Sequence, residues 1–358
     1  MSISLIKMTN FRNHTQTEMA FGPGVNVIWG ENGSGKTSIL EAIHLLSVGK
    51  SFKTNTTKEI IKDQKETTRI KGVFKTKNNK EQIITFGQTK SLKTKIKIND
   101  VLVKRKELLG KNPTVLLSPE EQGITTGSPG ERRRYFDKLY STVSSEYLND
   151  LLIYTKTLKQ RNSLLKTQPT EETINPWNIK LAEKAEKVWK TRYRFNNNFL
   201  QGLVNVSKAY NQTGVIVALK KEDIQTQKED LLLVFKKTLT KDIQTQRTTV
   251  GPHRDILSFT LNNKPIKIYG SQGEHKIALV LIKLAEYTFI KNETGETPTL
   301  LLDDLFAKLD FARSDAVLAL LEKKTQTIIT NTDLVDIKKH GINLEDTNNK
   351  NFHLMRAC

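Results

Sequence analysis

The chain has 358 residues, 37% of them hydrophobic, which is enough to form one large core or two smaller ones. Its 57 lysines and arginines outnumber 38 aspartates and glutamates, and the net charge of +19 favours a polyanionic partner, with nucleic acid first and an anionic membrane surface second. The single cysteine excludes a disulfide framework. No apolar run approaches the ~18 residues that span a bilayer, and no signal-peptide core is present. These features predict a cytoplasmic protein.

The N-terminal part predicts short strands and one helix. Residues 3–8 predict an edge strand, the glycine-rich turn at 21–24 leads into an apolar strand at 25–29, and apolar residues at helical spacing predict a helix that Gly49 ends. Further strands, most of them forming a strand-rich wing, are predicted at 69–75, 81–86, 92–98, 101–103 and 115–117.

Between the strand at 25–29 and this helix lies a match to the phosphate-loop pattern GxxxxGK[ST]. Its glycines let the backbone wrap closely and direct successive N–H groups inward, while the dipole of the following helix favours an anion at the same place. We expect Lys36 to reach the β- and γ-phosphates of a nucleotide and Thr37 to hold Mg²⁺. The whole predicted loop is Gly30, Glu31, Asn32, Gly33, Ser34, Gly35, Lys36 and Thr37.

From Glu131 onward, about eighty residues have a helical pattern. Pro169 and Pro176 are predicted to interrupt this region and to divide it into two long antiparallel helices. Their apolar side chains would share one seam, formed by Leu148, Leu151, Leu152, Leu158, Leu165, Leu181, Val188, Trp189 and Phe195.

The C-terminal third returns to alternating strands and helices. An apolar run from Thr299 ends in Asp303 and Asp304, which is how a phosphate-loop protein places a carboxylate beside its magnesium. Asp303 is the candidate for the metal, and Asp304 is the candidate that polarises an attacking water, so Lys36 and Asp304 are the predicted catalytic residues. The long stretch of chain between the two motifs indicates a lobe inserted between the halves of one ATPase head.

A second candidate for phosphate binding, Ser271, Gln272 and Gly273, precedes an apolar helical run at 277–285. Serine and glycine at a helix entrance present N–H groups and a hydroxyl to phosphate oxygens, although an ordinary helix cap has the same residues. Because the head already has a phosphate loop, we expect this turn to serve a nucleotide bound to another subunit.

The order of these motifs, with Leu309-Asp310 after the acidic strand, resembles that of ABC-type ATPase heads related to SMC and Rad-type repair ATPases. Other stretches are similar to the RecF family of bacterial recombination proteins in particular. They are Phe11-Arg12-Asn13, Ser51-Phe52, residues 117–120, residues 127–137 and residues 249–255.

The resemblance implies an α/β fold: an ABC-type P-loop ATPase head built from N- and C-terminal segments, with an inserted helical lobe that contains a short antiparallel coiled coil. We expect the head at 1–115 and 246–358 and the lobe at 116–245. The family also implies ATP and Mg²⁺ as cofactors and a homodimer that ATP joins head to tail. Ser271, Gln272 and Gly273 of one subunit would then close over the phosphates held by Lys36 of the other, and Thr330 to Thr332 would sense the γ-phosphate.

As to function, the resemblance implies ATP-driven dimerisation on DNA near single-strand gaps, with slow, DNA-stimulated ATP hydrolysis. Such a protein helps its partners RecO and RecR to load recombinase, supports stalled replication forks and contributes to the SOS response. Two alternatives stay open: the ATPase subunit of a membrane transporter, which shares these motifs, and a chromosome-organising ATPase, which would need a longer coiled coil.

Some residues depart from the family pattern, namely Lys50, Lys53, Glu274 and Lys308. Lys50 and Lys53 lack the planar fork of arginine, so a contact from their loop to the nucleotide of a partner subunit is in question. Glu274 and Lys308 alter the charge at the expected dimer seam. We expect DNA to be bound through its phosphates without base reading, because no base-reading motif is present. The candidates for contact are Lys53, Lys104, Arg105, Lys106, Arg132, Arg133 and Arg134, while His253 is expected to form a structural turn beside the nucleotide.

Overall fold

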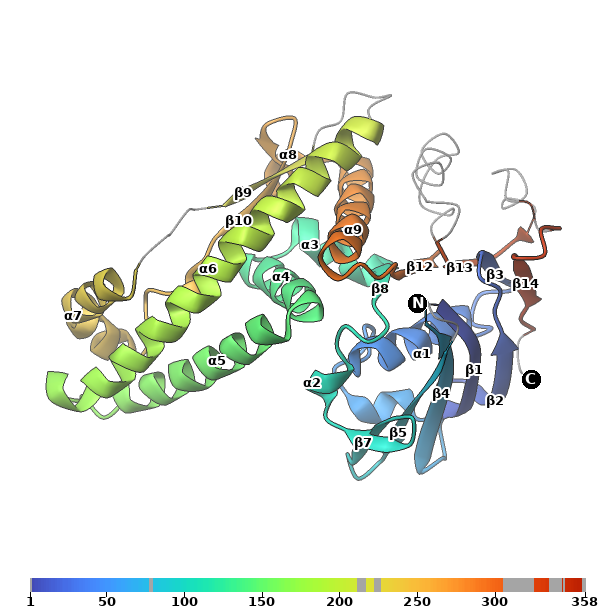
Figure 1. Cartoon of the computed structure of the whole chain (residues 1–358), viewed down its shortest axis with the longest axis horizontal. Helices are drawn as coiled ribbons and strands as arrows, with labels where there is room; N and C mark the ends of the chain where they lie inside the picture. Colours follow the sequence, from blue (N-terminus) through green and yellow to red (C-terminus); the bar gives the residue numbers. More distant parts are fainter. Residues whose placement is uncertain are drawn as a thin grey trace.

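The computed structural model describes residues 2–76, 80–210, 217–221, 227–304, 325–334, 343 and 345–355. Figure 1 shows a sheet-rich part, made of N-terminal strands and strands from the C-terminal third, beside an elongated part made of helices. The chain therefore leaves the sheet-rich part, forms the helices and returns. None of the helices in these ranges is long and apolar enough to cross a membrane.

A parallel five-stranded sheet lies in the sheet-rich part. Its order is β14 (Lys350–His353), β3 (Val25–Trp29), β13 (Thr327–Asn331), β12 (Thr299–Asp303) and β8 (Thr114–Leu117). All four pairings are parallel, so the carboxyl ends of strands from distant parts of the chain meet at one edge. Apolar runs such as those of β8 and β12 suit a sheet that is covered on both faces.

The two faces of this sheet belong to different hydrophobic cores. Alternate residues of each strand point to opposite faces. One core contains Val27, Val115, Leu300 and Ile329, and the other contains Ile28, Leu116, Leu301 and Ile328.

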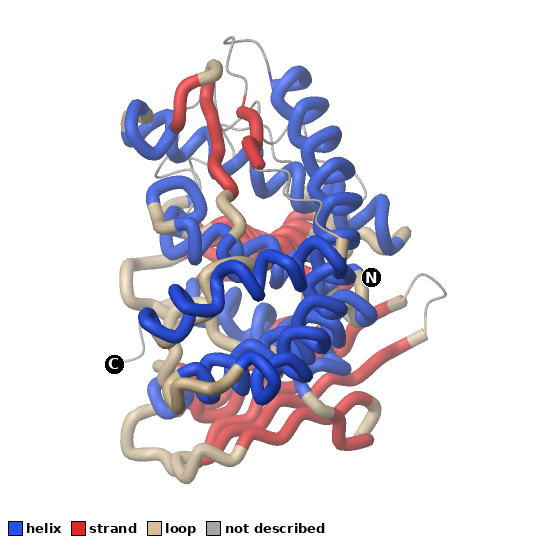
Figure 2. The backbone as a smooth tube through the Cα atoms, turned by 90° about the vertical axis from the view of Figure 1, so that its left-hand side faces the viewer, coloured by secondary structure: helices blue, strands red, loops and turns tan. Residues whose placement is uncertain are grey.

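The second of these cores also contains α1 (Lys36–Val48), which contacts strands of both the parallel sheet and a six-stranded antiparallel sheet. The order of the antiparallel sheet is β2 (His14–Ala20), β1 (Ser2–Phe11), β4 (Thr67–Lys75), β5 (Glu81–Thr89), β6 (Thr94–Ile98) and β7 (Val101–Val103). In the view of Figure 2 its long strands lie together at the bottom of the molecule.

The predicted strands of the wing are confirmed, but the prediction of an edge strand at residues 3–8 is wrong. β1 is paired on both sides, with β2 and with β4, and β7 forms an edge instead. Alternating polar side chains indicate that one face of a strand meets water, and they carry no information on whether its two edges are paired.

The helical part begins after β8. Its helices are α3 (Gly123–Thr126), α4 (Pro129–Val143), α5 (Ser145–Leu165), α6 (Glu171–Tyr210) and α7 (Lys228–Thr245). Figure 1 shows α5 and α6 side by side in opposite directions, as predicted. The interruption by Pro169 is confirmed, whereas Pro176 lies inside α6. A proline in the second turn removes one hydrogen bond, and the remainder of this 40-residue helix packs against α5 and α7 and tolerates the loss.

The predicted seam is partly wrong. Leu165, Leu181 and Phe195 are buried, but Leu152 is 49% exposed. The face of α5 that is buried carries Tyr147, Asp150, Tyr154, Thr157 and Arg161, so it is more polar than the leucine pattern predicted.

The C-terminal part adds α9 (Gln272–Thr294), whose side chains from Ile277 to Ile290 are nearly all buried and share one core with α4, α5 and α6. The predicted limits at 115 and 245 stay a prediction. The short elements are η1 (Thr57–Ile60), α2 (Arg105–Leu108), η2 (Pro119–Gln122), β9 (Val217–Lys221), η3 (Pro252–Arg254), β10 (Leu257–Leu261), β11 (Lys264–Pro265) and α8 (Ile266–Tyr269).

Candidate functional site

The predicted phosphate loop joins β3 to α1, as expected. Gly35 has a φ of 100°, and a Cβ on it would lie 2.5 Å from Nε2 of His14 and 2.7 Å from the side chain of Asn13. Only glycine fits a left-handed backbone so close to neighbouring atoms. Asn13 Nδ2 donates to the carbonyl oxygen of Gly33 at 3.2 Å, and His14 Nε2 lies 3.1 Å from the carbonyl oxygen of Gly35. The turn between β1 and β2 therefore braces the loop.

Lys36 is folded back onto its own loop. Its Nζ donates to the carbonyl oxygens of Gly30 at 2.7 Å and Glu31 at 2.9 Å. Burial lowers the pKa of Lys36, and the nearby carboxylates of Asp304 and Asp303 partly offset that shift. The ammonium group thus lies at the loop, held by carbonyls that an incoming phosphate can replace.

Asp303 joins the two halves of the sheet-rich part at the edge where the parallel strands end. Its Oδ1 accepts hydrogen bonds from the hydroxyls of Thr37 at 2.9 Å and Thr330 at 2.8 Å. Burial raises the pKa of Asp303, while the two hydroxyls lower it in part. Thr37 and Asp303 are 266 positions apart, and parallel pairing through β13 brings them together.

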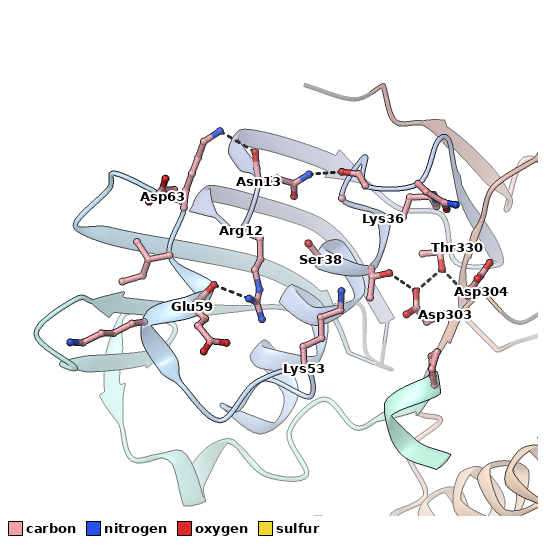
Figure 3. Close-up of a pocket in the computed structure, with 18 of the residues that line it drawn as sticks. Arg12, Asn13, Lys36, Ser38, Lys53, Glu59, Asp63, Asp303, Asp304 and Thr330 are labelled. Atoms are coloured by element: carbon pink, nitrogen blue, oxygen red, sulfur yellow. Dashed lines mark hydrogen bonds between the residues drawn. The ribbon is translucent and has the colours of Figure 1, made fainter. Parts of the chain in front are cut away.

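Asp304 has the same chemistry and different surroundings. Its backbone is left-handed, with φ 54°, and its N–H donates to Thr330 Oγ1 at 3.0 Å. Its Oδ1 is buried and has no hydrogen-bond partner among the described residues. Figure 3 shows Asp303, Asp304 and Thr330 together at one side of a cavity.

This cavity has a volume of about 850 Å³, within the range of small-molecule sites. Asn32, Gly33, Gly35, Lys36 and Thr37 of the loop line it, whereas Gly30, Glu31 and Ser34 do not. The other residues of its wall include several that the sequence did not assign to the site, because they come from the β1–β2 turn, from the segment around η1 and, for Lys90, from the β5–β6 turn. The basic ones are Arg12, Lys53, Lys58, Lys62 and Lys90.

Arg12 fixes one wall of this cavity. Its guanidinium forms two hydrogen bonds, of 2.7 and 2.9 Å, with the carboxylate of Glu41, which is fully buried on α1. It also donates to the carbonyl oxygen of Glu59 at 2.8 Å. A bidentate pair of this kind sets the distance between the β1–β2 turn and the helix that begins at the phosphate loop.

The Ser271 turn lies elsewhere. Ser271 is the N-cap of α9, and its hydroxyl donates to Glu274 Oε2 at 2.7 Å. Ser271 and Gln272 are exposed, and none of Ser271, Gln272 and Gly273 lines the cavity around Lys36. One chain therefore does not bring the turn to its own phosphate loop, and its contact with a partner's nucleotide stays a prediction.

The prediction that Arg132 contacts DNA is wrong. Arg132 is buried and donates to the carbonyl oxygens of Leu257 and Gly127, so it is not free to contact DNA. Arg134 remains exposed, while Arg133 is half-buried. The positions of Leu309-Asp310 and Lys308 lie outside the described residues.

His253 is structural, as expected, but it does not line the cavity of the phosphate loop. Its ring nitrogens lie 2.6 Å from the hydroxyl of Tyr154 and 2.9 Å from the carbonyl oxygen of Thr248. Burial lowers the pKa of His253 to about 4. The prediction of a turn beside the nucleotide is thus wrong in its location.

Comparison with known families and proteins gives one result throughout. Residues 2–344 match the family model described as RecF/RecN/SMC N terminal domain. The DNA replication and repair protein RecF of Ruminiclostridium cellulolyticum is 36% identical, covering 99% of this chain and 98% of its own length. That of Clostridium perfringens is 34% identical, covering 100% and 99%.

Solved structures agree. A structure of the recombination mediator protein RecF with ATP, in the RecFOR pathway, has a TM-score of 0.84 at 34% identity and covers 93% of this chain and 92% of its own. An SMC head bound to a domain of ScpA has a TM-score of 0.55 at 17% identity, over 95% of this chain and 92% of its own, which shows a shared fold alone.

Proposed function

Because the chain belongs to the RecF family, we propose that it is an ATP-dependent DNA-binding protein of recombinational repair and replication-fork maintenance. The observation that carries this proposal is the cluster of Lys36, Thr37, Asp303 and Thr330, which distant parts of the chain build at one edge of the parallel sheet. Relatives named as DNA replication and repair proteins, and a similar structure described with ATP, support the same reading.

ATP would bind with its phosphates in the loop from Gly30 to Thr37. Lys36 would exchange its bonds to the Gly30 and Glu31 carbonyls for contacts with the β- and γ-phosphates. The cationic wall of the cavity, which includes Arg12 and Lys53, would balance the charge of the triphosphate.

The residues present also fit Mg²⁺. The Thr37 hydroxyl and the Asp303 carboxylate are hard oxygen donors whose atoms are 2.9 Å apart, beside the place proposed for the phosphates. Magnesium in such sites uses one or two protein oxygens and takes the rest from phosphates and water. Bound there by Thr37 and Asp303, the ion would neutralise phosphate charge.

Asp304 would orient the attacking water. Its buried carboxylate oxygen lacks a hydrogen-bond partner in the described part of the chain and is thus free to accept a proton-bearing ligand. We expect slow, DNA-stimulated turnover, since a clamp on DNA needs a long-lived ATP state.

Two subunits would close around two ATP molecules, each contributing Ser271, Gln272 and Gly273 to the phosphates held by Lys36 of the other. The exposure of Ser271 and Gln272 at the start of α9 supports this arrangement, since the turn is accessible to a second copy. The dimer would sit near single-strand gaps, assist RecO and RecR in recombinase loading, and contribute to the SOS response.

DNA would be held through its phosphates. The net charge of +19 supports binding that is independent of sequence and weakens steeply with salt, because each phosphate contact releases counterions. A membrane-transporter ATPase has no such requirement, and the relatives favour the repair function.

Gel shift of gapped duplex DNA with and without ATP, together with sedimentation, tests the proposal. We expect ATP to promote both dimerisation and DNA binding, and Lys36→Ala to abolish the ATP effect on both. Lys159→Ala, which removes an exposed lysine of α5, is the matched control and should behave as the unmodified chain. Absence of DNA binding at low salt, or ATP-dependent dimerisation of Lys36→Ala, would refute it.

A further inference from the structure

A second cavity, with a volume of about 680 Å³, lies at the β7 edge of the antiparallel sheet. The end of α1, the segment from residue 50 to residue 60 and strands β5 to β7 form its walls. The phosphate loop contributes no residue to it, so it is distinct from the nucleotide site.

The rim of this cavity is cationic. Five exposed basic side chains line it, and none of the described residues that line it is an aspartate or a glutamate. Glu59 and Glu107 accept hydrogen bonds from Thr54 and from the backbone of Lys104 beside the cavity. The charged residues of the lining itself are all basic, so an anionic group is the expected ligand. The five residues are Lys50, Lys93, Lys95, Lys104 and Arg105.

The inner wall is apolar. Leu45, Ile60, Phe86 and Ile96 line the cavity and are buried. Leu102 also lines it and is 65% exposed. Leu92 and Val101, at 59% and 66% exposed, lie on the same stretch of chain. Aliphatic side chains gathered at a surface cavity indicate that an apolar group is covered there by a partner.

β7 adds a third feature. It is only three residues long, it pairs with β6 on one side, and it ends the sheet on the other. An edge strand offers backbone N–H and C=O groups to an extended segment of another chain, and side-chain pockets beside it give specificity.

We propose that this cavity binds an extended acidic segment of a partner protein. Carboxylates of the segment meet the cations of the rim, and one of its aliphatic side chains packs against the exposed Leu102. Nucleic acid matches these features less well, because a duplex held through its phosphates makes no use of the exposed Leu102, and single strands are held by aromatic side chains that stack on bases. The proposal therefore assigns Lys104 and Arg105 to this partner rather than to DNA. Phe86, the aromatic residue among those that line the cavity, is 2% exposed and presents no face to a base.

Fluorescence anisotropy of the full chain, without ATP, tests this proposal independently of the nucleotide site. The probe is a labelled synthetic nonapeptide in which aspartate alternates with leucine. The triple variant Lys93→Glu, Lys95→Glu and Lys104→Glu should bind it at least about tenfold more weakly. Its matched control reverses three exposed lysines of α5, of the turn that follows and of α6, with Lys159→Glu, Lys166→Glu and Lys180→Glu, and should keep the affinity of the unmodified chain.

A second variant separates the apolar contact from charge. Leu102→Ser should weaken peptide binding roughly fivefold at unchanged net charge. As a control for folding, each variant should have the same midpoint temperature of thermal unfolding as the unmodified chain. Because Leu102 is largely exposed, folding should not depend on it.

Three outcomes would overturn the proposal. The first is equal affinity of the peptide for the unmodified chain and the triple variant. The second is equally tight binding of a control peptide in which serine replaces each leucine. The third is an oligothymidylate that displaces the peptide and loses affinity in the triple variant but not in Leu102→Ser, since that pattern marks a nucleic-acid surface.

Discussion

Replacing Glu274 with glutamine is the sharpest test of the dimer model, because it should shift two measured quantities in opposite directions. In the single chain, Glu274 Oε2 accepts from both the N–H and the hydroxyl of Ser271, at 2.8 and 2.7 Å. These hydrogen bonds lower the pKa of Glu274, so the group is anionic at neutral pH. A partner's triphosphate at Ser271 would meet this negative charge directly.

The size of that repulsion follows from the geometry. A phosphate oxygen that bonds to the Ser271 hydroxyl would lie within about 5.5 Å of the Glu274 carboxylate. Two unit charges at that distance repel by about 0.75 kcal/mol in water and by about 3 kcal/mol near a protein surface. A dimer has two such sites, so Glu274→Gln should tighten ATP-dependent dimerisation by roughly tenfold or more.

The fold should respond in the opposite direction. Glu274 lies in the first turn of α9, where a negative charge interacts favourably with the helix dipole by about 0.3–1 kcal/mol. Glutamine keeps an acceptor for Ser271 but loses the charge. The free energy of unfolding of Glu274→Gln should therefore fall slightly while its dimer becomes tighter.

Sedimentation velocity with Mg²⁺ and a non-hydrolysable ATP analogue measures the dimer, and urea unfolding measures stability. Glu131→Gln is the matched control, because Glu131 forms the same capping box with Ser128 at the start of α4. It should lose similar stability and leave the dimer unchanged. Equal dimer dissociation constants for Glu274→Gln and the unmodified chain would refute the placement of Ser271 at a partner's phosphates.

Other predictions concern single groups. Asp304→Asn should slow phosphate release about 10²-fold or more and prolong the ATP dimer; an unchanged rate would exclude the water-orienting role. Arg161 and Asp242 form a fully buried ion pair, and Arg161→Met leaves the Asp242 carboxylate without its cation. The free energy of unfolding in urea should fall by about 3–5 kcal/mol, and a loss below about 1 kcal/mol would contradict this. The pKa of His253 is lowered from 6.5 to about 4, so its neutral ring stabilises the fold fully above pH 6.5 and this contribution is lost as the pH falls toward 4. The free energy of unfolding of His253→Gln should therefore rise less steeply with pH between about 4 and 6.5, by up to about 1.4 kcal/mol per pH unit.

Local patterns were sufficient for the elements that carry the site. The phosphate loop and its flanking strand and helix follow from short-range rules. The hairpin between β6 and β7 obeys the same kind of rule, because its turn residues Asn99 and Asp100 both have a positive φ, which asparagine and aspartate tolerate. These features depend on the conformational preferences of adjacent residues and need no tertiary information.

The brace on the phosphate loop could not be predicted in this way. Asn13 and His14 reach Gly33 and Gly35 because β1 and β2 fold back against the loop, and nothing in their local sequence indicates that contact. Arg132 failed for a related reason. In a run of arginines, the buried one is the one that faces a neighbouring element. Here Arg132 faces β10 and donates to the carbonyl oxygen of Leu257, which the local sequence does not indicate.

The two adjacent aspartates show how backbone conformation, rather than residue type, gives two carboxylates different surroundings. Asp303 is the last residue of β12 and keeps its extended course, so its carboxylate meets Thr37 across the sheet edge. Asp304 turns into a left-handed conformation that the hydrogen bond from its N–H to Thr330 supports. One carboxylate is thereby fixed by two hydroxyls, while the other keeps an oxygen without a hydrogen-bond partner among the described residues. Because Thr330 bonds to both, a shift of β13 would move Asp303, the proposed metal ligand, and Asp304, the proposed water-orienting residue, together.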